Sequence, residues 1–148
     1  MDLILWRHAE AEDGVPDHAR KLTAKGIKQA AKVATFLNQH LPEEPRILVS
    51  PATRTQQTAA AFTHHFTLAP TIAPGASAEA VLHAARWPDA GGTVLIVGHQ
   101  PTLGEVAARL IGCEGATLGI KKGSIWWFSQ REGSAQATLR LVITPDLL

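Results

Sequence analysis

Residues 3–8 read LILWRH, four large apolar side chains followed by an arginine and a histidine. An apolar run of this length is typical of a strand buried inside a sheet. Arg7 and His8 are poor core material but suit a binding site, because ligands of open α/β sheets bind beyond the carboxyl ends of the strands. The alternative is a chance dipeptide leaving the core, since short motifs often match by accident.

Two further apolar runs end in a similar way. Residues 94–97 read VLIV and are followed closely by His99, and residues 47–49 read ILV and are followed by Arg54. A proline after each of these runs suits the first turn of a helix, and Ser50 suits an N-cap. Arg54 is therefore expected in a first helical turn, where free N–H groups and the helix dipole favour anions.

Three predicted strand ends thus carry basic and imidazole side chains. They supply two guanidinium groups, from Arg7 and Arg54, and two imidazole groups, from His8 and His99. Because the carboxyl ends of parallel strands meet at one edge of a sheet, these groups are expected close together. The combination predicts a site for an anion the size of a phosphoryl group.

The composition is that of an ordinary globular domain. The chain has 148 residues, 45% of them hydrophobic and 18% charged, with a formal net charge of +1. We expect a single domain over residues 1–148. No run of lysine or arginine predicts a basic face, and Lys121-Lys122 is interpreted as a solvated turn, so a nucleic-acid partner is not expected.

A single cysteine, Cys113, excludes an intramolecular disulfide and fits a reducing compartment. No apolar stretch reaches membrane-spanning length, and the first six residues are too short for a signal-peptide core. These features predict a cytoplasmic protein without a membrane partner.

Hydrophobic periodicity predicts strands and helices in alternation. Helices are expected over residues 24–41, from 51 to about 66, from 78 to 86, and after Pro101 as far as Gly112. A short extended piece is expected at residues 71–72, and caps at Thr23 and Ser77. The inward face of the first helix is predicted to contain Ile27, Ala30, Ala31, Ala34, Leu37 and Leu41. That of the last helix is predicted to contain Leu103, Val106, Ala107, Leu110 and Ile111.

The last part of the chain has a different pattern. Residues 124–128 and 138–143 are β-type runs joined by a turn at residues 131–134, which predicts a hairpin. Trp126 and Trp127 are adjacent in a strand, so one is expected inward and one outward, as hairpin packing or, alternatively, as part of a partner-binding surface. We therefore predict a three-layer α/β/α sandwich whose mainly parallel sheet ends in an antiparallel C-terminal edge hairpin.

Four short motifs in this order resemble the histidine phosphatase superfamily, also called phosphoglycerate mutase-like. They are RHAE at residues 7–10, RKLT at 20–23 with Gly26, SPATRTQQT at 50–58 and VGHQP at 97–101. The short chain, the RKLT block and the C-terminal hairpin look most like the small SixA-type phosphohistidine phosphatases. Fold and superfamily do not by themselves define the substrate.

The resemblance implies a role for each strand-end residue. His8 is implied as the nucleophile that forms a covalent phosphohistidine, and Arg7 and Arg54 as bidentate donors to the phosphoryl oxygens. His99 is implied as a further donor, protonated when an anion is bound. Arg20 matches the Arg of the RKLT block and is implied to reach the phosphate; an exposed arginine flanking a helix is the alternative.

One departure from the superfamily concerns the acid that protonates the leaving group. Members that act on alkyl phosphates carry an acidic residue after the third strand, whereas residues 73–77 here read APGAS. Glu79 is the nearest candidate, and it is more simply interpreted as a first-turn helix carboxylate. Glu10 is a second candidate because it is close to His8 in sequence. A site without a well-placed general acid favours a leaving group that departs readily, such as the imidazole of a phosphohistidine.

Three classes of function follow. The first is a phosphatase acting on phosphohistidine in a partner protein, and the second is a small-molecule phosphomonoesterase. The third is a non-catalytic module that binds phosphate or a phosphoprotein, which an intact His8 disfavours. A metal site with His8 and His99 lacks a third ligand, and Arg7 and Arg54 would repel a cation, so neither metal nor cofactor is expected.

Overall fold

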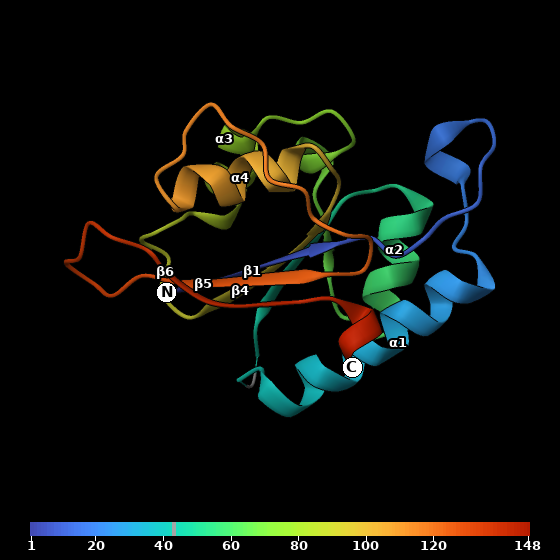
Figure 1. Cartoon of the computed structure of the whole chain (residues 1–148), viewed down its shortest axis with the longest axis horizontal. Coiled ribbons are helices and arrows are strands. Elements are labelled where there is room, and N and C mark those ends of the chain that lie inside the picture. The colour runs from blue at the N-terminus through green and yellow to red at the C-terminus, as the bar shows by residue number, and fades with distance from the viewer. Residues whose placement is uncertain (43) are drawn as a thin grey trace.

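The computed structural model describes residues 1–42 and 44–148, which form one sheet with helices on both faces (Figure 1). The strands are β1 (Asp2–Arg7), β2 (Arg46–Val49), β3 (Thr67–Leu68), β4 (Thr93–Gly98), β5 (Ile125–Ser129) and β6 (Thr138–Ile143). The helices are α1 (Ala24–His40), α2 (Thr53–Ala60), α3 (Ala78–Ala85) and α4 (Thr102–Leu110). Short 3₁₀ turns lie at Asp17–Ala19, Pro70–Ile72 and Pro145–Leu147. No helix in the described ranges is long and apolar enough to cross a membrane.

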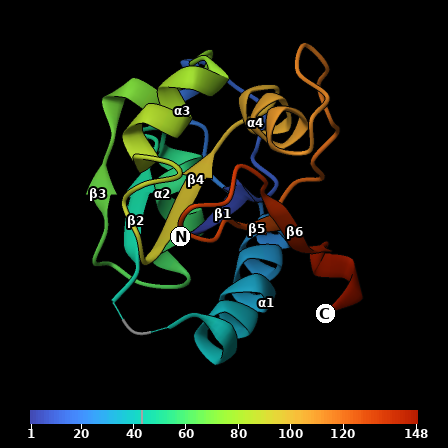
Figure 2. The same ribbon diagram turned by 90° about the vertical axis from the view of Figure 1, so that its left-hand side faces the viewer.

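The strand order of the sheet is β3-β2-β4-β1-β5-β6. β1 and β2 both pair in parallel with β4, whereas β5 is antiparallel to β1 and to β6. α1 and α2 cover one face, and α3 and α4 cover the other (Figure 2). The predicted three-layer sandwich with an antiparallel C-terminal hairpin is confirmed. β1 lies in the middle of the sheet, so its carboxyl end is at the centre of the edge formed by the carboxyl ends of the parallel strands.

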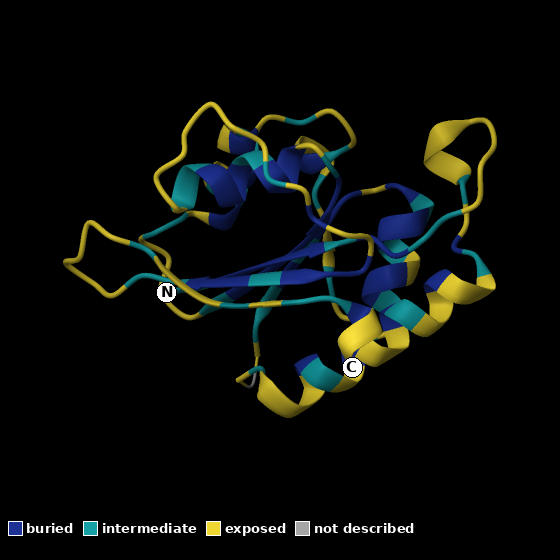
Figure 3. Cartoon of the chain, viewed as in Figure 1, coloured by how far each residue is buried: buried dark blue, intermediate teal, exposed yellow. Residues whose placement is uncertain are grey.

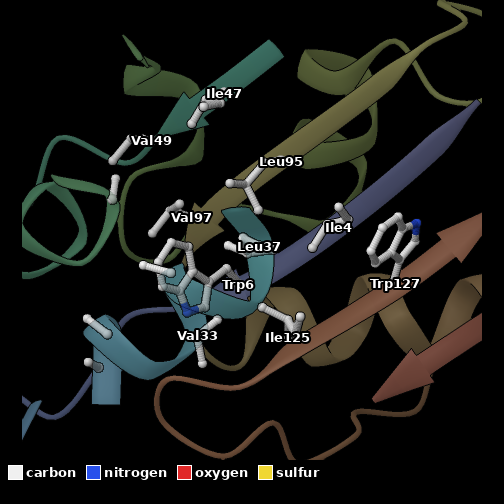
Figure 4. Close-up of a cluster of buried hydrophobic side chains, with 14 of the residues drawn as sticks. Ile4, Trp6, Val33, Leu37, Ile47, Val49, Leu95, Val97, Ile125 and Trp127 are labelled. Carbon is white, nitrogen blue, oxygen red and sulfur yellow. The ribbon is translucent and has the colours of Figure 1, made fainter. Parts of the chain in front are cut away.

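Side chains alternate between two buried clusters, one on each face of the sheet. Ile4 and Trp6 join the cluster beneath α1 and α2 (Figure 4), and Leu3 and Leu5 join the one beneath α3 and α4. The central strands are buried, whereas the outer sides of the helices and most loops are exposed (Figure 3). The tryptophans of β5 alternate as predicted: the buried Trp127 packs with Ile4, and the half-buried Trp126 packs on the opposite face.

The helix predicted over residues 24–41 is α1, which ends one residue earlier, at His40. Its buried face is rotated by one residue from the predicted one. Its Thr23 cap accepts a hydrogen bond from the Gly26 amide at 2.9 Å. Ile27 is 58% exposed and Ala31 is also exposed, so their predicted burial is wrong. The reason is the close contact of Gly26 with the Glu10 backbone, which leaves no space for a Cβ and turns Gly26 inward. The buried face is therefore Gly26, Ala30, Val33, Ala34 and Leu37.

The second helix is shorter than predicted. α2 begins at Thr53 after Ala52 and ends at Ala60, so Ser50 is not its cap and it does not reach residue 66. The extended segment is β3 at residues 67–68, whereas residues 70–72 form a 3₁₀ turn. The Ser77 cap is confirmed, since its hydroxyl accepts a hydrogen bond from the Ala80 amide at 3.1 Å. Beyond α4, Ile111 is 43% exposed, because it follows the last helical residue and leaves the inner face.

Candidate active site

The two histidines of the predicted site follow the adjacent strands β1 and β4. Arg7 is paired with Gly98 in the parallel register, and the His8 amide donates to the Gly98 carbonyl at 3.0 Å. This register places the side chains of His8 and His99 side by side, with ring centroids 5.4 Å apart. Both imidazoles are buried, with residue exposures of 7% and 4%.

The two arginines approach the same strand ends from different elements. Arg54 lies in the first turn of α2, and its Nη2 is 3.4 Å from Nδ1 of His99. Arg7 ends β1 and donates from Nη1 to the carbonyl of Ile120 at 2.7 Å. Within the described part of the chain, the buried Nε atoms of both arginines have no hydrogen-bond partner. Buried donors without partners are costly, so these two atoms are exceptions among the buried polar groups of the fold.

The ring of His8 is held in one tautomer. Its Nδ1 lies 2.7 Å from the carbonyl oxygen of Ala9, and a carbonyl only accepts, so the proton is on Nδ1. The lone pair of a neutral ring is then on Nε2. Burial, opposed by the Ala9 hydrogen bond and aided by the charges of Arg54 and Arg7, lowers the pKa of His8 to about 4. His8 is therefore neutral, and able to act as a nucleophile, at physiological pH.

His99 has the opposite tautomer. The Arg54 guanidinium can only donate, so Nδ1 of His99 accepts, and its Nε2–H donates to Oγ of the buried Ser50 at 2.7 Å. Burial, together with the charges of Arg54 and His8, lowers the pKa of His99 to about 3. Ser50 was expected as a helix cap, but its hydroxyl instead orients the second histidine of the site.

Asp17 links Arg54 to Arg20. Its carboxylate accepts from Nη2 of Arg54 at 3.1 Å and from Nε of Arg20 at 3.1 Å, and its backbone carbonyl accepts from Nη1 of Arg54 at 2.9 Å. Desolvation acts in the opposite direction, but these arginines hold the pKa of Asp17 below its usual range. Asp17 thus occupies the Nη1–Nη2 edge of Arg54. The sequence gave no sign of it, because a loop carboxylate without regular spacing carries no pattern.

Arg20 is half-buried and lies at the rim of this cluster. Besides Asp17, it donates from Nη1 to the carbonyl of Glu12 at 3.2 Å. Its charge is close enough to contribute to the lowered pKa of His8. The structure therefore brings Arg20 to Arg54 through Asp17, and its direct contact with a phosphate stays a prediction.

The two candidate acids lie apart from this geometry. Glu79 is exposed in the first turn of α3, and the Glu10 carboxylate accepts from the Thr23 hydroxyl at 2.8 Å. In the ranges that the structure covers, His, Cys, Asp and Glu side chains form no group of three or more that could hold a metal ion.

Comparison with known proteins shows the family of this chain. The family model described as histidine phosphatase superfamily (branch 1) matches residues 3–77, half of the chain, including His8 and Arg54. The chain therefore belongs to the histidine phosphatase superfamily, as its motifs indicated.

One curated relative and two solved structures illustrate the similarity. A phosphohistidine phosphatase SixA homolog of Haemophilus influenzae is 37% identical over 128 residues, which cover 76% of this chain and 78% of the relative. The solved structure of the protein histidine phosphatase SixA with tungstate has a TM-score of 0.84 at 24% identity, covering 99% of both chains. Phosphoserine phosphatase of Entamoeba histolytica, in complex with phosphoserine, has a TM-score of 0.75 at 19% identity, covering 99% of this chain and 98% of its own. At these identities, the two structures are evidence for the fold alone.

We expect the imidazoles of His8 and His99 to titrate with midpoints near pH 4 and pH 3 in the folded protein. NMR titration of the labelled rings measures this directly. A histidine in the unfolded chain titrates near pH 6.5, so the unfolded state binds more protons between these values. The free energy of unfolding should therefore fall as the pH drops below about 6.5, on the order of 3 kcal/mol from His8 by pH 4. Ring midpoints near 6.5 would contradict the buried, neutral histidines.

Asp17→Asn should lower kcat about tenfold with little change or a decrease in KM, with p-nitrophenyl phosphate as substrate. The variant loses the charge that orients Arg54, which weakens stabilisation of the transition state. Asp17→Asn also removes a carboxylate that binds the guanidinium of Arg54. The affinity for the substrate before reaction is therefore not lowered. Asp13→Asn is the matched control, because Asp13 is exposed in the same loop. Equal kinetics for the two variants would show that Asp17 does not position Arg54.

Proposed function

We propose that this protein is a phosphatase that removes phosphoryl groups from phosphohistidine in a partner protein, through a covalent phosphohistidine on its own His8. The observation that carries the proposal is the free Nε2 lone pair of a neutral His8 whose pKa is lowered by burial and by the nearby charges of Arg54 and Arg7. A neutral nucleophile next to fixed cations suits attack on an anionic phosphoryl group.

The proposed reaction has two steps. In the first, Nε2 of His8 attacks phosphorus, the new N–P bond forms, and the bond to the leaving nitrogen breaks as that nitrogen takes up a proton. Arg7 and Arg54 stabilise the charge on the equatorial oxygens. The bound anion raises the pKa of His99 from its low value in the free protein, so that a protonated His99 supplies a further donor. In the second, water attacks phosphorus, Nε2 of His8 departs, and inorganic phosphate is released. The Nδ1 hydrogen bond to Ala9 keeps the ring oriented in both steps.

The choice of substrate follows from two features of the site. Glu79 is exposed, and Glu10 is bonded to Thr23, so neither carboxylate is directed to a leaving group. A phosphohistidine needs less help from an acid than an alkyl phosphate does, because its leaving nitrogen protonates easily. The connections after β2 and β4 are short, residues 50–52 and 99–101, and neither contributes a lid. The longer connection after β1, residues 8–23, is held to Arg54 by Asp17. The similarity to the Haemophilus SixA homolog supports the same substrate class.

We expect kcat/KM to fall steeply as the pKa of the leaving group rises, with phosphoramidate and p-nitrophenyl phosphate hydrolysed faster than sugar phosphates. The same slope should be found in Glu79→Gln and Glu10→Gln, because neither carboxylate acts as the acid. The measurement is release of inorganic phosphate from a series of aryl and alkyl phosphates. Efficient hydrolysis of alkyl phosphates that disappears in either variant would instead indicate a small-molecule phosphomonoesterase.

A further inference from the structure

All six lysines of the chain lie in two segments, residues 21–32 and 121–122. The fold brings these segments together. Lys25, Lys28 and Lys32 of α1 line a surface cavity of about 280 Å³ together with Lys121, and these four residues are called the lysine groove below. The expectation that no basic face forms is therefore wrong: Lys25, Lys28 and Lys32 are spaced by three and four residues and share one side of α1, and the fold adds Lys121.

The lysine groove borders the strand end that carries the proposed nucleophile. On one side, the amide of Gly123 donates to the carbonyls of Arg7 and His8 at 3.2 and 3.1 Å. On the other side, Gln29 of α1 lies within the row of lysines, and its Oε1 accepts from the Glu10 amide at 2.9 Å. Both walls of the groove are thus bonded to backbone within two residues of His8.

The lysines of α1 are unfavourable for the helix itself. Lys25 lies in the first turn, where the helix dipole disfavours a cation, and α1 contains no acidic residue. Lys28 follows Lys25 by three residues and precedes Lys32 by four, spacings at which like charges repel. Across the described residues, these three lysines form no ion pair, whereas Lys121 pairs with Asp146 at 3.1 Å. Side chains that oppose local stability indicate a functional requirement.

We propose that the lysine groove binds an acidic surface of the protein that carries the phosphohistidine, which presupposes the function proposed above. Lysines that border the strand end of His8 raise the association rate of an acidic partner over long distances, and they select among proteins that carry the same phosphorylated residue. Binding of nucleic acid is less favoured, because no aromatic side chain on which a base could stack is among the described residues that line the groove.

The test compares two synthetic peptides of equal length, each with one phosphohistidine, flanked by glutamates in one and by glutamines in the other. At low ionic strength, we expect kcat/KM for the acidic peptide to be about tenfold higher, and this preference to disappear at 0.5 M salt. The triple variant Lys25→Gln/Lys28→Gln/Lys32→Gln should lose the preference and keep its turnover of p-nitrophenyl phosphate. Its unfolding midpoint should equal or exceed that of the parent protein, because repulsion along α1 is removed.

The control compares Lys28→Gln with Arg131→Gln, since Arg131 is exposed in the β5–β6 loop at the other end of the sheet (Figure 1). Only Lys28→Gln should weaken the preference for the acidic peptide. Equal kcat/KM for both peptides, or a preference that survives in the triple variant, would overturn the inference and leave the proposed function intact. Turnover of p-nitrophenyl phosphate without turnover of either peptide would overturn both. Without a peptide preference, binding to phosphatidylserine vesicles or single-stranded DNA that the triple variant loses would reassign the groove to that ligand.

Discussion

His8→Ala is expected to reduce turnover of p-nitrophenyl phosphate by several orders of magnitude. The variant removes the free Nε2 lone pair of His8. The other neutral imidazole, His99, directs its Nδ1 lone pair to Arg54 and its Nε2–H to Ser50, so it offers no free lone pair. A steady-state assay with His64→Ala as control measures the effect, since His64 is exposed and distant from the strand ends.

The same mechanism predicts a phosphoenzyme that can be trapped. Rapid quenching with a labelled substrate should leave the phosphoryl group on His8, stable in alkali and labile in acid, and mass spectrometry should locate it. The label should be absent from His8→Ala and present in His64→Ala. Retention of most turnover by His8→Ala would exclude covalent catalysis at this residue.

Arg54→Ala is expected to lower kcat by roughly 10² to 10³, the usual effect of removing one preorganised donor to developing charge. Arg54→Lys should recover little of this loss, because the three N–H donors of an ammonium group leave one nitrogen, whereas the planar guanidinium spreads its donors toward His99, Asp17 and a phosphoryl oxygen. The assay is turnover of p-nitrophenyl phosphate with Arg131→Ala as the matched control.

Tungstate binding gives an independent measurement of the same site. The oxyanion should inhibit the parent protein competitively, and its affinity should fall in both Arg54 variants and remain in Arg131→Ala. If tungstate binds the Arg54 variants as tightly as the parent protein, Arg54 is not a ligand of the anion.

The sheet and its catalytic edge could be predicted because their signals are local. Three apolar runs mark β1, β2 and β4, and the parallel pairing that alternation predicts places their ends at one edge. His8, His99 and Arg54 are therefore neighbours for a reason visible in the sequence. The limits of α1 were also predictable, because Thr23 caps its first turn and Pro42 follows its end.

The remaining features depend on contacts between distant segments. The orientation of α1 follows from the fit of Gly26 against the Glu10 backbone, which periodicity alone does not contain. Serine is a residue type that often caps helices, so the sequence favoured that role for Ser50. Only the position of His99 shows that the Ser50 hydroxyl accepts from its ring. Asp17 meets Arg54 across 37 residues through a loop, so neither its spacing nor its residue type predicted the contact.

The position of β1 has a consequence for the order of folding. Its neighbour β5 is distant in sequence, and the indole of Trp6 donates to the carbonyl of Gly123 across 117 residues. Closing so long a loop has a large entropic cost, and contacts of this separation slow folding. During synthesis, β1 emerges first but lacks its antiparallel neighbour until residues 125–129 have left the ribosome. The central strand that carries His8 therefore completes its pairing late, and a nascent chain without the C-terminal hairpin leaves one edge of β1 uncovered.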